Sequence, residues 1–152
     1  MSRISREELW MALATLVSER SSCSRAKVGS IIIDQRNRVI SMGYNGAPAR
    51  QDHCLGIGCL VDELGHCRRT IHAEINAIIN AQASVDGCWM YSTHEPCLEC
   101  LKVCITAGID YIYFIENYIP PASDLRVTQD FRSDNGIVIE REVGEKYFRV
   151  CL

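Results

Sequence analysis

Residues 71–83 read IHAEINAIINAQA, and residues 92–108 read STHEPCLECLKVCITAG. In the first stretch, apolar residues recur at the spacing of one face of a helix. In the second, Pro96 stands where a helix would begin, and a glycine at the end is suited to closing it. We therefore expect two helices, each opening at a polar motif: His72-x-Glu74 in one and Pro-Cys-x-x-Cys in the other.

Strand and helix patterns alternate on both sides of these two stretches. Apolar residues at helical spacing predict a helix over about 5–20, and β-branched runs at 30–34 and 38–43 predict a hairpin. The stretch from 43 to 70 shows little periodicity. Further strands are expected at 88–92, 111–115 and 136–140, with a helix over about 123–133. This order predicts an α/β fold with a mixed five-stranded sheet between helices on both faces.

Length and composition are those of one globular domain. The chain has 152 residues, of which 47% are hydrophobic and 23% are charged. These values exclude a disordered, collagen-like or coiled-coil chain, and we expect a single domain over 1–152. Because the net charge is -3, no nucleic-acid partner is expected, although a local basic group can still hold a small anion.

Nine cysteines are the unusual feature of the composition. The charged opening MSRISREELW lacks the apolar segment of a signal peptide, and no apolar run reaches the ~18 residues of a membrane span. We therefore expect a cytoplasmic protein with no membrane partner. In reducing surroundings, clustered cysteines bind metal or act in catalysis more often than they form disulfides.

His72, Cys97 and Cys100 form a set of candidate zinc ligands. One imidazole and two thiolates leave the fourth position of a tetrahedral Zn²⁺ for water, as in catalytic zinc sites. A helix N-terminus also favours the thiolate form of cysteine. Glu74 is too close to His72 in sequence to be a comfortable ligand of the same ion, so we expect it to move protons. A closed structural zinc site or a buried cysteine pair is the alternative that Cys-x-x-Cys alone would allow.

The two motifs in this order are the signature of zinc-dependent nucleobase deaminases. In the expected reaction, Zn²⁺ lowers the pKa of its water toward ~7, and the resulting hydroxide attacks C4 of cytosine. Glu74 carries the water proton to N3 and then helps ammonia to leave. These roles place Zn²⁺ and Glu74 at the centre of the predicted chemistry.

Five stretches of the chain resemble the deoxycytidylate (dCMP) deaminase family of the cytidine-deaminase-like superfamily. They are SSCSRAKVGSIII (21–33), GYNGAP (43–48), HCLGIGC (53–59), GHCRRTIHAEINAI (65–78) and STHEPCLEC (92–100). They run in family order over about 20–118, and the cysteine-rich insert is most similar to the bacterial and phage branch. The resemblance implies a three-layer α/β/α sandwich, conversion of dCMP to dUMP for thymidylate synthesis, and a homo-oligomer, often a hexamer. Some members are activated by dCTP and inhibited by dTTP, so these nucleotides are candidate effectors.

Four residues are candidates for contact with the substrate. By the same resemblance Asn45 would contact the deoxyribose, although Asn-Gly also favours a simple turn. His94, two residues before Pro96, could bond sugar or phosphate, be an alternative zinc ligand or lie on the surface. Arg25 suits a phosphate or is a solvated loop charge. Tyr118 could stack on the base or belong to the core or an interface.

A second metal site is expected in the aperiodic region, because a structural zinc would order a loop that buries little apolar surface. Related sequences suggest the ligand set Cys23, Cys54, His66 and Cys67. Spacing does not settle between Cys59 and these cysteines, or between His53 and His66. Scattered buried thiols are the alternative interpretation.

Other functions compete with dCMP deamination. The substrate could be dCTP, a modified dCMP or a nucleoside, because substrate choice rests on phosphate contacts that the motifs do not define. A nucleic-acid editing protein is disfavoured by the net charge and by the small number of Phe and Trp residues. A nucleotide-binding protein without catalysis is disfavoured by Glu74, because a carboxylate beside a metal-bound water is costly unless it is used.

Overall fold

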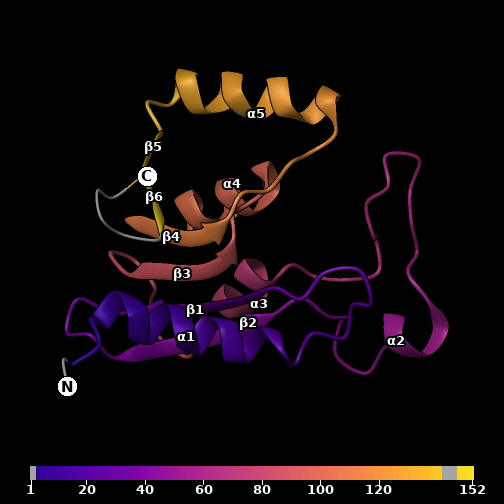
Figure 1. The fold of residues 1–152 in the computed structure, drawn as a ribbon, viewed down its shortest axis with the longest axis horizontal. Coiled ribbons are helices and arrows are strands. Elements are labelled where there is room, and N and C mark those ends of the chain that lie inside the picture. The colour runs from indigo at the N-terminus through magenta and orange to yellow at the C-terminus, as the bar shows by residue number, and fades with distance from the viewer. Residues whose placement is uncertain (1–2, 142–146) are drawn as a thin grey trace.

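The computed structural model describes residues 3–141 and 147–152, and Figure 1 shows the path of the chain. The elements in chain order are α1 (Arg6–Ser18), β1 (Gly29–Ile33), β2 (Val39–Tyr44), α2 (Cys54–Ile57), α3 (Ala73–Ile79), β3 (Trp89–His94), α4 (Leu98–Thr106), β4 (Tyr111–Glu116), α5 (Ala122–Asp134), β5 (Val138–Arg141) and β6 (Phe148–Cys151). Among the described residues, no helix has the length and apolarity needed to cross a membrane.

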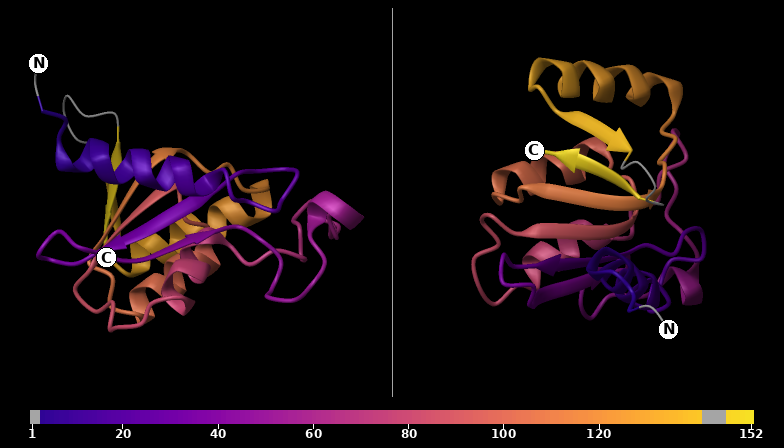
Figure 2. Two further views of the ribbon diagram at one scale, coloured as in Figure 1. Left: turned by 90° about the horizontal axis from the view of Figure 1, so that it is seen from below. Right: turned by 60° about the vertical axis from the view of Figure 1, so that its left-hand side comes forward.

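The strands form one mixed sheet in the order β2-β1-β3-β4-β6-β5. β3 and β4 are parallel, whereas the other neighbouring pairs are antiparallel. Figure 2 shows α1 on one side of the sheet and α3 and α4 on the other. The predicted α/β/α sandwich around a mixed sheet is therefore confirmed.

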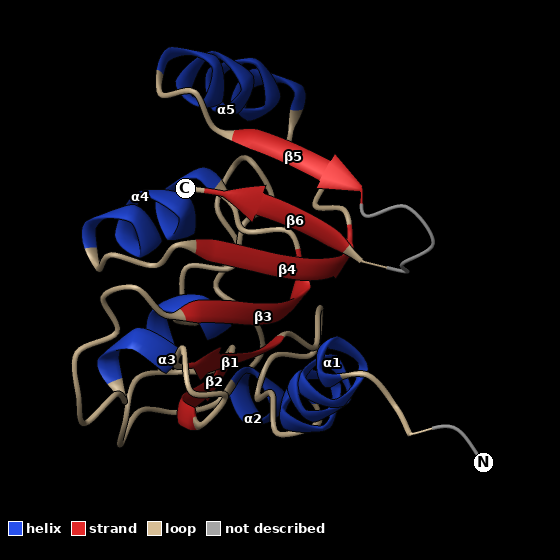
Figure 3. Ribbon diagram, turned by 90° about the vertical axis from the view of Figure 1, so that its left-hand side faces the viewer, coloured by secondary structure: helices blue, strands red, loops and turns tan. Residues whose placement is uncertain are grey.

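The sheet has six strands, one more than the sequence predicted. The additional strand, β6, lies between β4 and β5 (Figure 3), so the predicted last strand becomes an edge of the sheet. β6 is held by antiparallel pairing with β4 and by Val150, whose side chain is fully buried. Four residues with one fully buried side chain are too short to show a period, which is why the sequence did not reveal this strand.

Side chains of the central strands alternate between two apolar layers. Ile31 and Ile33 pack with Met11 on the α1 side, whereas Ile32 and Met90 belong to the cluster on the α3 and α4 side. Successive side chains of a strand point to opposite faces of the sheet. A continuous apolar run such as the one in β1 therefore serves both layers and marks a strand at the centre of the fold.

Gly43 allows α3 to lie close to β2. A Cβ atom at Gly43 would overlap the backbone of Ala73 and Ala77, so a larger residue would push the helix away. The Ser41 hydroxyl also donates to the Ala77 carbonyl at 2.6 Å. These contacts fix the start of α3, and with it His72, against the sheet.

The region between β2 and α3 is held by polar contacts more than by apolar packing. It contains the short helix α2 and two isolated bridges, Gly46 with Ile71 and Val61 with Cys67. Figure 1 shows this segment extending away from the sheet. Leu55, Leu60 and Leu64 lie exposed along it. Because apolar packing contributes little here, other interactions, such as these polar contacts, have to order the segment.

Candidate active site

The three predicted zinc ligands meet where two helices begin. His72 is the N-cap of α3, Cys97 is the N-cap of α4, and Cys100 lies in the first turn of α4. Nδ1 of His72 lies 3.2 Å from Sγ of Cys100 and 3.4 Å from Sγ of Cys97. The ligand atoms lie within 4.8 Å of one another. One nitrogen and two sulfur atoms at this spacing fit a tetrahedral Zn²⁺ with one position left for another ligand.

The local sequence explains why the ligands are held rigidly. The helix α4 begins at Leu98, two residues later than Pro96 suggested, so Cys97 takes the N-cap position. No side-chain cap bond is formed at either His72 or Cys97, which leaves both side chains available to a metal. Preorganised ligands on two helix starts need no loop rearrangement to bind an ion.

Hydrogen bonding within the trio determines the charge of the thiols. The bond from Cys100, followed by that from His72, lowers the pKa of Cys97 to about 4. The same contact with Cys97, together with burial, raises the pKa of Cys100. The bond to the Cys97 thiolate also raises the pKa of His72. Cys97 is therefore already in the thiolate form that binds metals.

Glu74 lies buried beside the two cysteines. Its side chain is in the first turn of α3 and only 3% exposed. The Cys100 thiol donates to its Oε2 at 3.7 Å. Burial raises the pKa of the Glu74 carboxyl to about 7. A carboxyl with such a pKa can both accept and release a proton near neutral pH.

A cavity of about 270 Å³ opens onto this cluster. Of the side chains that the sequence singled out for the catalytic metal, proton transfer and substrate, Cys100 alone is not among the lining residues; those that line the cavity are Arg25, Asn45, His72, Glu74, His94, Cys97 and Tyr118. Apolar residues Ala26 and Val28 contribute to one wall. The cavity has the character of a small-molecule site, with a few polar groups converging on one region.

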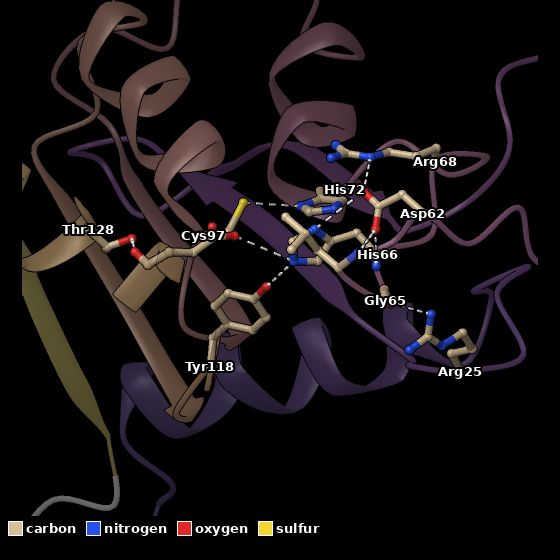
Figure 4. A network of polar contacts seen from close by, with 11 residues as sticks. Arg25, Asp62, Gly65, His66, Arg68, His72, Cys97, Tyr118 and Thr128 are labelled. Carbon is tan, nitrogen blue, oxygen red and sulfur yellow. Dashed lines mark hydrogen bonds and ion pairs between the residues drawn. The ribbon is translucent and has the colours of Figure 1, made fainter. Parts of the chain in front are cut away.

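The four predicted substrate residues occupy this cavity in different ways. Asn45 is buried, with Oδ1 accepting from the Val28 N–H at 2.9 Å and Nδ2 donating to the Ala26 carbonyl at 2.8 Å. Its amide therefore braces the loop before β1, a role that neither interpretation of the sequence named. Arg25 donates to the Gly65 carbonyl at 2.5 Å, which ties this loop to the cysteine-rich segment (Figure 4).

His94 and Tyr118 reach the cavity from the ends of β3 and β4. Nε2 of His94 lies 3.1 Å from the Glu116 carboxylate, and Nδ1 lies 3.0 Å from the Thr93 hydroxyl. Figure 4 shows the Tyr118 ring next to Cys97, with its hydroxyl directed at His66. That hydroxyl lies 3.4 Å from Nε2 of His66. Burial raises the pKa of Tyr118, so the phenol stays protonated and can donate.

A second group of thiols gathers beside the cavity, and two of its members, Cys23 and Cys67, contribute to the lining. Sγ atoms of Cys23, Cys54 and Cys59 lie within 4.8 Å of one another. Sγ of Cys67 lies 3.7 Å from that of Cys54. Three of the four predicted ligands of a second metal are thus brought together, and Cys59 joins them. We call Cys23, Cys54, Cys59 and Cys67 the four-thiol cluster.

His66, the remaining predicted ligand of the second metal, lies outside the four-thiol cluster. Its Nδ1 lies 3.7 Å from the Asp62 carboxylate and its Nε2 lies 3.7 Å from that of Asp124. Cys67 pairs with Val61 in an extended bridge, and neighbouring side chains of extended backbone point in opposite directions. The His66 ring is directed at the Asp62 and Asp124 carboxylates and not at the thiols, although His66 and Cys67 both contribute to the cavity lining.

Two charged residues beside the cavity were not singled out from the sequence. Glu95 directly precedes Pro96, and it forms an ion pair with Arg132 of α5 at 2.7 Å. The sequence shows only two isolated charges 37 positions apart. No local motif marks such a pair, because the contact exists only when α5 folds back over the end of β3.

Comparison with known proteins agrees with this geometry. The family described as the cytidine and deoxycytidylate deaminase zinc-binding region matches residues 4–116. The chain belongs to this family.

The curated relatives include deoxycytidylate deaminases and ComE operon protein 2. The chain is 44% identical over 121 residues to ComE operon protein 2 of Bacillus subtilis, covering 78% of this chain and 63% of that protein. It is 37% identical over 123 residues to human deoxycytidylate deaminase, covering 72% of this chain and 64% of the human protein. It is 32% identical over 126 residues to the deoxycytidylate deaminase of Mycobacterium phage D29, covering 75% of this chain and 97% of the phage protein. The match thus spans slightly less than two thirds of the first two relatives.

A solved structure shows the same architecture. The dCMP deaminase of cyanophage S-TIM5, in complex with dCMP and dUMP, matches with a TM-score of 0.68 and 29% identity. The match covers 86% of this chain and 94% of the phage chain. This chain therefore shares its fold with a solved deaminase that binds dCMP and dUMP.

Proposed function

We propose that this protein hydrolyses dCMP to dUMP and ammonia, with Zn²⁺ as cofactor. The observation that carries the proposal is the buried Glu74 carboxyl beside His72, Cys97 and Cys100 at the floor of a cavity. The family match and the dCMP-binding relative support the choice of substrate.

His72, Cys97 and Cys100 would hold the metal in this reaction. When bound, Zn²⁺ supplies Lewis acidity that makes water a nucleophile near neutral pH. Glu74 takes a proton from the attacking water and delivers it to N3 of the cytosine ring. The water oxygen forms its bond to C4. Glu74 then takes the second proton from the new C4 hydroxyl and gives it to the amino group, as the C4–N bond breaks and the C4 carbonyl forms. Cytosine and water thus become uracil and ammonia, with no further reactant.

The cavity walls account for substrate binding. Tyr118 covers the base, and His94, held by Glu116, donates to the sugar or phosphate. The Arg25 guanidinium binds the phosphate, and Asn45 contacts the sugar next to it. Related cytosine substrates such as dCTP or a modified dCMP are the competing assignment, because they share the same base and differ at these walls.

The four-thiol cluster is proposed as a second, structural Zn²⁺ site. Four thiolates complete a tetrahedral zinc shell and leave no position for water. Cys23 connects the loop before β1 to the cysteine-rich segment, so an ion here would order a region that buries few apolar side chains. Within the part of the chain that the structure describes, no carboxylate belongs to the cluster, whereas the Glu74 carboxyl accepts from Cys100 at the catalytic trio; this fits a structural role.

Further properties of the protein are proposed on two grounds. Length, composition and cysteine usage favour a single domain over 1–152 and a cytoplasmic location, and the resemblance to the family suggests assembly into a hexamer, activation by dCTP and inhibition by dTTP. Sedimentation of the purified protein tests the assembly. Titration of dCTP and dTTP into the activity assay tests the effectors.

A substrate panel tests the proposed activity. Loss of the cytosine absorbance is followed with dCMP, dCTP, deoxycytidine and CMP, each with and without added dCTP. Turnover of dCMP above the others is expected. Preference for another of these substrates would replace dCMP by that compound. Absence of turnover in protein shown to contain zinc would overturn deamination of these nucleotides.

A further inference from the structure

Glu95 uses both of its carboxylate oxygens to connect α5 with the rim of the cavity. Oε1 accepts from Nη2 of Arg132 at 2.7 Å. Oε2 accepts from the backbone N–H of Tyr118 at 3.1 Å. Glu95 stands two residues before Cys97 and lines the cavity. One side chain thus links the start of the metal-binding helix, the segment after β4 and the last helix.

The ion pair of Glu95 with Arg132 is shielded from water, so breaking it would lower the stability of the fold. The Arg132 side chain is 15% exposed and that of Glu95 is 11% exposed. Exposed ion pairs contribute little, whereas breaking a buried pair leaves an uncompensated charge in a poorly solvated place. Nε of Arg132 is buried without a hydrogen-bond partner in the described part of the chain. The positive charge of Arg132 is therefore compensated by the Glu95 carboxylate.

Backbone pairing places this contact where β3 and β4 end. The Glu95 N–H donates to the Glu116 carbonyl at 2.8 Å, which continues the parallel pairing of the two strands by one bond. Beyond this point the chains diverge, one into α4 and the other toward Tyr118 and α5. The Glu95 side chain bridges them at the point of divergence.

Tyr118 is consequently held both at its backbone and at the hydroxyl end of its side chain. Its backbone N–H is fixed by Glu95, and its hydroxyl lies 3.4 Å from Nε2 of His66. Figure 4 shows the ring next to Cys97, with its hydroxyl directed at His66. A side chain restrained at both ends loses little freedom when a ligand binds against it, and this favours tight binding.

We propose that Glu95, neutralised by Arg132, is a positioning residue that fixes Tyr118 over the substrate cavity and so determines the affinity for the nucleotide. This inference rests on the proposed deamination of a cytosine nucleotide. Glu95 itself does not touch the reacting atoms. Its removal therefore weakens substrate binding and leaves the chemical step nearly unchanged.

Stability and positioning can be separated with paired substitutions. Glu95→Leu leaves Arg132 buried and uncompensated, so it lowers stability as well as affinity. In Glu95→Leu combined with Arg132→Leu, two apolar side chains replace the ion pair, and such replacements are often neutral or stabilising. The double variant restores the fold but still lacks an acceptor for the Tyr118 N–H. Glu95→Gln keeps such an acceptor and serves as the conservative rescue.

The expected result for the double variant is a KM for dCMP about tenfold above wild type, the effect of losing one hydrogen bond to a charged group. Its kcat stays within about twofold, its zinc content is unchanged, and its melting temperature is close to wild type. Glu95→Gln recovers part of the affinity. In a Tyr118→Ala background, Glu95→Gln has no additional effect on KM, because Glu95 acts through Tyr118. Glu140→Gln breaks the ion pair with Arg149, outside the cavity lining, and leaves KM unchanged.

A wild-type KM in the stable double variant would overturn the positioning role, and so would a KM effect of Glu95→Gln that persists without Tyr118. If the wild-type protein turns over no cytosine nucleotide, the proposed function fails on its own. Hydrogen exchange of the 117–121 segment then still tests the positioning: faster exchange at Tyr118 in the double variant supports it, and unchanged exchange overturns it.

Discussion

The catalytic trio and the four-thiol cluster use similar ligands on different kinds of backbone. His72, Cys97 and Cys100 stand at the starts of α3 and α4, which pack against the central sheet. The four thiols stand on the loop before β1 and on the segment between β2 and α3. Both groups contribute to the lining of the cavity, the trio through His72 and Cys97 and the four-thiol cluster through Cys23 and Cys67. Among the residues described, only the trio has a buried carboxyl in contact with a ligand.

This difference shows how placement divides the roles of a metal site. Ligands on helices that apolar packing already holds do not depend on an ion for their position, so the ion is free to do chemistry. Ligands on loops with little apolar burial depend on the ion for order, and binding energy becomes folding energy. We therefore expect catalysis and stability to respond separately when the two groups are changed.

The largest effect on activity is expected for Glu74→Gln. Removal of the proton carrier should lower kcat by about 10²–10⁴-fold or more. The substitution leaves the ligand atoms in place, so zinc content should not change. Steady-state rates with dCMP and metal analysis of the same sample test this prediction. A kcat within tenfold of wild type would contradict the assigned role.

The largest effect on stability is expected for Cys54→Ser, at the centre of the four-thiol cluster. Loss of an ion that orders the loop should lower the melting temperature by about 10 °C, the shift that a few kcal/mol produces in a chain of this size. Cys97→Ser, the matched change in the catalytic trio, should abolish turnover with a smaller shift. Thermal unfolding and zinc content of both variants give the comparison. Equal shifts would show that the two groups do not divide the roles.

An intermediate effect is expected where the cysteine-rich segment meets the cavity. Cys59→Ala should lower zinc content by one ion per chain, because Cys59 belongs to the four-thiol cluster.

His66→Ala should retain all zinc and raise the KM for dCMP by severalfold, because Tyr118 loses the contact with its hydroxyl. Zinc loss in His66→Ala would instead support the ligand set that related sequences suggested.

The smallest effect is expected for Asp62→Asn, which removes a support of the cysteine-rich segment that needs no metal. The N–H of His66 bonds to this carboxylate and, with the Arg68 guanidinium, holds the pKa of Asp62 below its ordinary value. A lowered folded pKa means that the stabilisation is present above the unfolded pKa of about 3.9 and is lost as pH falls through the folded value. Wild type should therefore lose slightly more stability than Asp62→Asn between pH 5 and the acid limit of the fold. Parallel unfolding curves over that range would contradict this.

Local patterns predicted the α/β class and most of the helices and strands. Apolar residues at helical spacing predicted a helix over about 5–20, and the structure has α1 there, with a capping box in which Ser5 and Glu8 bond to each other's backbone N–H. The helices α3 and α4 begin within two residues of their motifs. The strand β6 was not predicted, because its position is set by pairing with β4 and β5 and by the burial of one side chain.

At the candidate site, the sequence motifs were sufficient to predict that His72, Glu74, Cys97 and Cys100 lie together. Each lies within a few residues of a helix start, so the local period of the chain already orients its side chain. Three features could be found only in the folded chain. Cys59 takes the place predicted for His66 in the four-thiol cluster, His66 contacts Tyr118, and Glu95 forms an ion pair with Arg132. These contacts join segments distant in sequence, and their partners are selected by loop direction and by the packing of α5, which no short-range pattern encodes.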